Sequence, residues 1–410
     1  MSATIFLRHI IYIVFLSGTL LLLNACNQGK QISGEKPLAS QESFILRYGH
    51  LHNSLFRIKT EKQATVAFLG GSITNMDGWR KMVSDYLQET FPNTKFTFIN
   101  AGIPSLGSVP HAFRLQKDVL DKGRIDLLFI ESAVNDHQNN TPERQQRRAL
   151  EGIVRHAITA NPFMDMVLMA FAEKDKLDEY ASGSTPTEVN VHNDIANHYH
   201  LPFINLAKEV YARIAAGEFS WEKDFKDLHP SPFGQQVYFE SIKSLLQPET
   251  ANKPSADLLM KKIPEPLDKF SYNNGRYIPV EQADSMQGFQ TDIAWKPADG
   301  TATRSGYVNV PVLTAEKTPA SLRFHFTGTA AGIAVLAGPD AGKIRYAIDN
   351  GPDQYANLFT RWSSRLHLPW YLVLGDGLEP GKHTLQITLL PPVDTTSKNT
   401  ACRIVHFLVN

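Results

Sequence analysis

The segment Thr65-Val-Ala-Phe-Leu-Gly-Gly-Ser-Ile-Thr74 is the most informative one about the fold of the first half of the chain. Residues 65–69 are apolar and favour a strand, so they predict a buried strand. The apolar spacing of residues 79–87 predicts a helix. The turn between them can present the Ser72 hydroxyl as a nucleophile, and the N–H groups at a helix N-terminus can bind an oxyanion. A simple N-cap role for Ser72 or Thr74 would explain the same residues.

Strands and helices alternate through the first half of the chain. Further apolar runs, typical of parallel strands buried on both faces, lie at residues 96–100, 126–130, 166–170 and 202–205. Residues 144–159 and 187–198 are two of the helical stretches between them. This alternation predicts a doubly wound α/β domain. Ligands of such domains bind beyond the carboxyl ends of the strands, where Ser72, Asn100 and Asn135 fall.

Composition limits the classes of function. The chain has 410 residues, which suggests two or three domains. Hydrophobic residues make up 42% and charged residues 20%, as in a folded globular protein. Lys+Arg and Asp+Glu both number 41, so no net field attracts nucleic acid, and we expect no nucleic-acid partner.

The N-terminus predicts a signal peptide over residues 1–25. Arg8 precedes an apolar stretch from Ile10 to Leu23, which is short for a membrane span. The segment that ends at Cys26 resembles the lipobox of bacterial lipoproteins, which implies that this cysteine carries lipid. A plain secretory signal or an uncleaved anchor is the alternative. We therefore expect a protein that is lipid-anchored to a membrane of the bacterial cell envelope.

The remaining chain divides into four predicted parts. Residues 26–43 form a polar tether, residues 44–247 the α/β domain, and residues 248–267 a linker rich in proline and lysine. Residues 268–410 change to short strands separated by Gly, Asp, Asn and Pro turns, which predicts an all-β sandwich of jelly-roll type. Its strands are expected at residues 321–326, 332–336, 343–348, 383–389 and 401–407.

Cysteines and histidines indicate neither a disulfide framework nor a metal site. If Cys26 carries lipid, Cys402 has no partner, and its strand-like surroundings predict a buried thiol. His192, His198 and His200 lack the i, i+4 spacing of a helical metal pair. We interpret these histidines as surface or helix-end residues and expect no metal and no other cofactor.

Four segments of the α/β domain carry residues suited to ester hydrolysis. They are residues 70–74, 100–108, 131–136 and 226–234, and the first three follow predicted strands. Together they resemble the four blocks of the SGNH (GDSL-like) hydrolase superfamily, which supply Ser, Gly, Asn and His in that order. The resemblance covers about half the chain. It implies a flavodoxin-like, three-layer fold and a serine esterase that requires no metal.

The resemblance also implies a role for each residue. Ser72 attacks the acyl carbonyl, and His229 is the base that takes its proton. Three N–H donors form the oxyanion hole: the Ser72 backbone, the Asn135 side chain and a backbone N–H of the second block. The glycine of that block often lies at the position of Ser105, and Gly107 follows two residues later. Both stay candidates.

Two positions depart from the family pattern. Gly71 stands where the family often has aspartate. Lys226 stands where the family's acid usually lies, three residues before His229. Asp227, Asp224 or a backbone carbonyl is left to orient the histidine, and we favour Asp227.

The first hypothesis is a serine esterase that removes acyl groups, above all acetyl, from a carbohydrate. It rests on the Ser–Asn–His set, the predicted anchor and the sandwich, in which Trp295, Trp362 and Trp370 could pack in the core or form a sugar-stacking platform. A lipase, lysophospholipase or thioesterase on the same site is the second hypothesis. A non-catalytic, glycan-binding lipoprotein is the third.

Overall fold

A computed structural model describes residues 44–251, 257–392 and 400–410. All described residues belong to one compact unit. The predicted signal peptide, Cys26 and the tether lie outside the described residues, so lipidation and anchoring stay predictions. The described part of the chain contains no helix long and apolar enough to cross a membrane.

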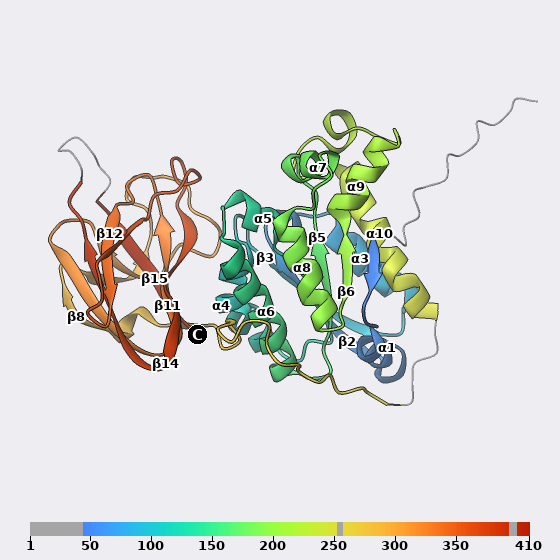
Figure 1. Cartoon of the computed structure of the whole chain (residues 1–410), viewed down its shortest axis with the longest axis horizontal. Coiled ribbons are helices and arrows are strands. Elements are labelled where there is room, and N and C mark those ends of the chain that lie inside the picture. Colours follow the sequence, from blue (N-terminus) through green and yellow to red (C-terminus); the bar gives the residue numbers. More distant parts are fainter. Residues whose placement is uncertain (1–43, 252–256, 393–399) are drawn as a thin grey trace, which may run out of the picture. The chain divides into compact units, whose positions relative to one another are not determined.

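A six-stranded sheet lies at the centre of the α/β part (Figure 1). Its strands, in chain order, are β1 (Ile45–Arg47), β2 (Gln63–Gly70), β3 (Lys95–Gly102), β4 (Leu127–Glu131), β5 (Asp165–Ala170) and β6 (Pro202–Asn205). The spatial order is β1-β6-β5-β4-β2-β3, and all neighbours are parallel except β1, which is antiparallel to β6. Five strands confirm the predicted ones. The edge strand β1 has three residues, too few for a recognisable pattern.

Helices cover both faces of this sheet. They are α1 (His52–Phe56), α2 (Ser72–Asn75), α3 (Trp79–Thr90), α4 (Ser108–Asp118), α5 (Ala133–Gln138), α6 (Glu143–Ala160), α7 (Lys174–Ala181), α8 (Thr187–His198), α9 (Leu206–Ala215) and α10 (Pro232–Ala251). Helices α4, α6 and α8 pack side by side on one face, while α3 and α10 pack together on the other (Figure 1). The chain therefore reverses its winding between β2 and β4. Such a switch point is where doubly wound folds bind ligands.

Helix α10 extends beyond the predicted start of the linker. It continues to Ala251 and contains Pro248, which has no N–H to donate to the carbonyl of Ser244. The guanidinium of Arg47 donates to that carbonyl at 2.8 Å and to the carbonyl of Leu245 at 3.2 Å. A side chain of β1 thus replaces the missing helical hydrogen bond, which explains why the proline does not end the helix.

The C-terminal part is a curled, all-antiparallel sandwich. Its strands are β7 (Arg276–Ile278), β8 (Ala283–Gln287), β9 (Gln290–Trp295), β10 (Val310–Ala315), β11 (Ala320–Ala337), β12 (Lys343–Ile348), β13 (Gln354–Asn357), β14 (Leu368–Leu389) and β15 (Cys402–Val409). The predicted strands 321–326 and 332–336 are one strand, β11. The small residues near Gly328 that suggested a turn instead shift the register between β11 and β14, as a β-bulge does.

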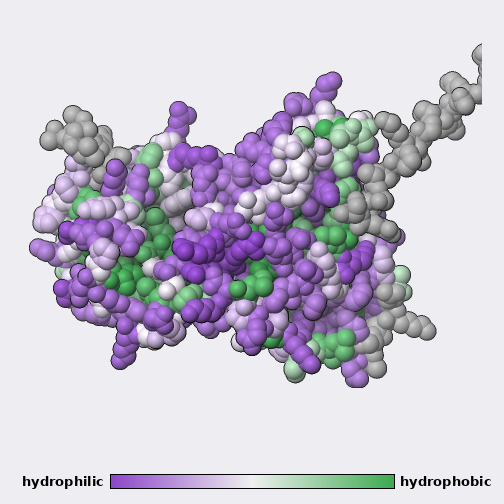
Figure 2. All heavy atoms as spheres, in the orientation of Figure 1, coloured by the Kyte–Doolittle hydropathy of each residue, from purple (hydrophilic) through white to green (hydrophobic). Residues whose placement is uncertain are grey.

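The remaining residues singled out in the sequence differ in how far they are buried. Cys402 is fully buried, as predicted, and burial raises the pKa of its thiol to about 12. Trp295 is also buried, whereas Trp362 is 38% exposed. The interpretation of His192 as a surface residue is wrong: it lies on the face of α8 that packs on the sheet, and its Nδ1 is 2.7 Å from the carbonyl of Glu188. On the face drawn in Figure 2, hydrophilic side chains predominate.

Candidate active site

Ser72 lies at the first position of α2, directly after the glycine turn that ends β2. Gly71 is the N-cap of this helix and provides no side-chain cap, and the Thr74 hydroxyl is buried without a partner among the described residues. The capping alternative therefore lacks support. A Cβ on Gly71 would lie 1.9 Å from Oδ1 of Asn135. Glycine is needed here because the segment after β4 packs directly against the turn.

His229 reaches Ser72 from the loop before α10. Its Nε2 lies 2.8 Å from Oγ of Ser72, within hydrogen-bond distance. The imidazole side chain is 49% exposed, so the pair is open to solvent. A hydroxyl that contacts an imidazole in this way can transfer its proton when it attacks a carbonyl.

The carboxylates near His229 occupy different positions. Oδ1 of Asp227 accepts the backbone N–H of His229 at 2.5 Å and lies 3.8 Å from its Nδ1. The carboxylate of Asp224 instead accepts two bonds from Ser220, at 2.8 and 3.2 Å. Lys226 adopts a φ of 82°, a conformation rarely adopted by residues other than glycine. Asp227 is thus the carboxylate beside the histidine ring, although at more than hydrogen-bond distance.

Four N–H groups of the segments around Ser72 have no acceptor within the part of the chain that the structure describes. They are the backbone N–H groups of Ser72, Ser105 and Gly107 and the side-chain amide of Asn135. The three segments converge, because a Cβ on Gly71 would contact Asn135 and would lie 3.4 Å from the carbonyl of Leu106. Unpaired N–H donors beside a nucleophile are what an oxyanion hole requires.

Ser105 adopts a left-handed backbone conformation that is typical of glycine. It follows Pro104 in a turn closed by a bond from the Leu106 N–H to the Ile103 carbonyl at 3.3 Å, and its φ is 72°. This is the third position of a type II turn, which favours glycine. Its carbonyl accepts the side-chain amide of Asn139 at 2.9 Å. The position where the family often has glycine therefore keeps the left-handed conformation, while Gly107 is the N-cap of α4.

Two buried residues that sequence reasoning missed hold the strand ends. Arg114 of α4 is fully buried, and its guanidinium donates to the carbonyls of Gly70 and Ala101 at the ends of β2 and β3. Glu131 ends β4 and accepts the N–H groups of Val134 and Phe171, at 3.1 and 3.4 Å. Burial raises the pKa of Glu131 to about 7. Arg114 lies within a helix and Glu131 within a strand, and nothing in the neighbouring sequence distinguishes them from charged residues on the surface of such elements.

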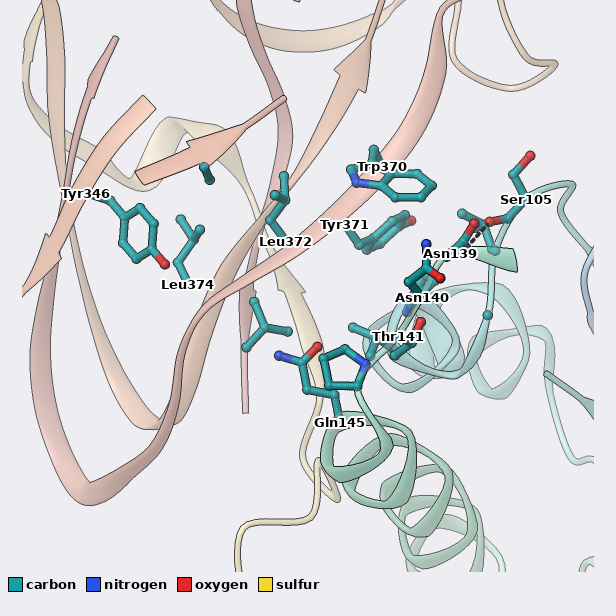
Figure 3. Close-up of a pocket in the computed structure, with 17 residues that line it drawn as sticks. Ser105, Asn139, Asn140, Thr141, Gln145, Tyr346, Trp370, Tyr371, Leu372 and Leu374 are labelled. Carbon is teal, nitrogen blue, oxygen red and sulfur yellow. Dashed lines mark hydrogen bonds between the residues drawn. The ribbon is translucent and has the colours of Figure 1, made fainter. Parts of the chain in front are cut away.

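A groove of about 260 Å³ adjoins the second-block loop (Figure 3). Ser105 and Gly107 line one side, and Figure 3 shows Trp370 and Tyr371 of β14 facing Asn139 across it. Both aromatic side chains are half-buried. The groove therefore combines aromatic surfaces with amide groups. Among the described residues, no group of three or more His, Cys, Asp or Glu side chains is arranged to hold a metal ion.

Residues 68–237 match the model of the GDSL-like lipase/acylhydrolase family. The chain therefore contains a GDSL-like lipase/acylhydrolase domain, of the SGNH superfamily, at residues 68–237. The four sequence blocks lie within or at the edges of the matched range.

Two solved structures of a two-domain esterase (CEX) active on acetylated mannans have the same fold. One has a TM-score of 0.74 and 21% sequence identity, and covers 90% of this chain and 98% of that chain. The other, co-crystallised with mannopentaose, has a TM-score of 0.72 and 21% identity, with 90% and 97% covered. No curated protein sequence matches this chain.

Proposed function

We propose that this protein is an esterase that removes O-acetyl groups from a polysaccharide, with Ser72 as nucleophile and His229 as base. The observation that carries the proposal is the 2.8 Å contact between these two side chains at the switch point of the sheet. The unpaired N–H groups beside Ser72 support it, because they suit a tetrahedral oxyanion.

The reaction follows from this geometry. Ser72 Oγ attacks the acetyl carbonyl while His229 Nε2 takes its proton, and the oxyanion is bound by the N–H groups of Ser72, Asn135 and the second block. Collapse of the intermediate expels the sugar oxygen, which receives the proton from His229. Water, deprotonated by the same imidazole, then hydrolyses the acetyl-serine and releases acetate.

Asp227 is proposed to orient His229, with a modest effect on rate. Because its carboxylate is 69% exposed and 3.8 Å from Nδ1, water weakens their interaction. We expect Asp227→Asn to lower kcat by about 10-fold, well below the roughly 10⁴-fold loss known for a buried, directly bonded acid. Asp224→Asn is expected to stay within about 2-fold of wild type, since Ser220 holds that carboxylate. Steady-state kinetics with p-nitrophenyl acetate measure kcat of both variants. A larger loss of kcat for Asp224→Asn than for Asp227→Asn would mean that Asp224 orients the histidine.

The carbohydrate part of the proposal rests on the groove and on the fold. Trp370 and Tyr371 offer aromatic surfaces, and Asn139 and Asn140 offer amide groups, beside the loop that contains Ser105. Aromatic rings with neighbouring polar groups suit sugar rings, which have apolar faces and hydroxyl edges. The CEX esterase, which shares the two-domain fold, is active on acetylated mannans, which makes an acetylated mannan the first substrate to test.

Acetate release from acetylated mannan tests the proposal. We expect Ser72-dependent release by the wild-type chain, and a KM about 10-fold higher for Trp370→Ala, which corresponds to roughly 1.4 kcal/mol of lost binding. Hydrolysis of p-nitrophenyl acetate should change less than about 2-fold, because this small ester does not need the groove.

Tyr355→Ala is the matched control, since Tyr355 is a 67% exposed aromatic residue of the edge strand β13. It should leave KM for the polymer unchanged. Preference of the wild type for long-chain esters over acetate esters would favour the lipase or thioesterase alternative. Equal effects of Trp370→Ala on both substrates would contradict the proposed role of the groove.

A further inference from the structure

Asp136 follows Asn135 in α5 and contacts a different part of the fold. Successive residues of a helix point about 100° apart, so the two side chains leave α5 in different directions. Asn135 packs against Gly71, as described above. Asp136 lies against the N-terminus of α4, where its Oδ1 accepts the backbone N–H of Ser108 at 2.8 Å and its hydroxyl at 3.0 Å.

This contact also explains the glycine before Ser108. A Cβ on Gly107 would lie 2.4 Å from Oδ1 of Asp136, so no side chain fits between the carboxyl group and the loop. An acidic group is favourable at a helix N-terminus, where it satisfies an otherwise unpaired N–H. Asp136 therefore caps α4 from another helix and holds Gly107 against α5.

The carboxyl group is costly to bury. Asp136 is 1% exposed, and its Oδ2 has no partner within the described residues. Glu188 of α8 and Glu131 of β4 repel its negative charge, and Lys176 of α7 attracts it. Burial is the largest effect and raises the pKa of Asp136 to about 7, although both bonds from Ser108 oppose that rise.

We propose that Asp136 is a positioning residue of the oxyanion hole: its carboxyl group sets the distance between the N–H of Gly107 on the α4 side and the amide of Asn135 on α5. The inference rests on the proposed function, because it assumes that these N–H groups bind the oxyanion. Asp136 touches neither the ester nor Ser72 and acts only through the two segments it joins.

The test measures hydrolysis of p-nitrophenyl acetate by full-length variants. We expect Asp136→Ala to lower kcat about 30-fold with KM within about 2-fold, as for loss of a contact made in the transition state. Asp136→Asn keeps an acceptor for Ser108 and should recover kcat to within about 5-fold of wild type. The control is Asp126→Ala: Asp126 is 2% exposed and accepts the N–H of Thr65 at 2.8 Å, but at the opposite end of β4. It should leave kcat within about 2-fold.

A double-mutant cycle separates positioning from stability. In an Asn135→Ala background the oxyanion hole is already incomplete, so adding Asp136→Ala should lower kcat by less than a further 5-fold or so. If the effect of Asp136→Ala were purely structural, it would lower kcat by the same factor in both backgrounds. The proposal would be overturned if the losses of Asn135→Ala and Asp136→Ala were additive in activation free energy. It would also be overturned if Asp136→Ala lowered kcat no more than Asp126→Ala does. If Asp136→Ala does not fold, Ser108→Ala replaces it in the same cycle. We expect Ser108→Ala to lower kcat about 4-fold in the wild-type background and not at all in the Asn135→Ala background. Absence of Ser72-dependent hydrolysis in the wild type would instead refute the proposed function.

Discussion

Replacement of Ser72 by alanine is expected to lower kcat for p-nitrophenyl acetate and for acetylated mannan by about 10⁴-fold or more. No other nucleophile contacts His229 Nε2 within the described residues, so the covalent route is lost, and only binding and the N–H donors remain. Ser72 is partly exposed, and among the described residues its hydroxyl forms a hydrogen bond only with His229, so the melting temperature should change little. Acetate release and thermal unfolding measure the two effects.

Ser84→Ala is the control for this variant. Ser84 lies on α3, is also partly buried and donates its hydroxyl to the carbonyl of Arg80 at 2.9 Å. It should retain full activity. Hydrolysis by Ser72→Ala at a tenth of the wild-type rate or more would mean that the nucleophile lies elsewhere and would refute the proposed mechanism.

The second large effect is expected for Asn135→Ala. The variant removes one N–H donor from the oxyanion hole, and loss of a single donor typically lowers kcat by about 10²- to 10³-fold, or about 2.7 to 4 kcal/mol. KM should change little, because the amide binds the oxyanion of the transition state more strongly than the carbonyl of the substrate. Asn135→Asp should be at least as impaired, since it replaces the donor by a negative charge.

Asn161, a partly buried asparagine away from the site, is the control for this variant. Asn161 donates its side-chain amide to the carbonyl of Ile125 at 2.8 Å, near the start of β4 rather than its end. Asn161→Ala should lose stability without losing kcat. A raised KM with unchanged kcat for Asn135→Ala would place the amide in ground-state binding and would remove it from the oxyanion hole.

Much of the α/β sheet could be predicted from the sequence because its signals are local. The apolar run before Gly71 and the turn that follows have the residues of a strand and a tight bend, whatever lies around them. The same holds for the runs before Asn100 and Asn135. The predicted sandwich strands were less accurate, because the small residues near Gly328 fit a turn as well as a bulge, and only pairing with β14 distinguishes the two.

The carboxylates show where local signals end. Asp224 and Asp227 both lie a few residues before His229 in sequence, yet Asp224 accepts hydrogen bonds from Ser220 and Asp227 accepts the backbone N–H of His229. The burial of His192 likewise depends on which face of α8 packs on the sheet. Sequence spacing alone contains neither fact.

Local sequence patterns were sufficient to predict the order of strands and helices in the α/β part, the glycine turn at Ser72 and the four segments that could supply an esterase site. The folded chain was needed to see that His229 reaches Ser72, that Asp136 joins α5 to α4, and that Trp370 lies beside the loop of Ser105. Periodicity and turn chemistry act between neighbours in the chain, whereas a site depends on contacts between distant segments that only folding brings together.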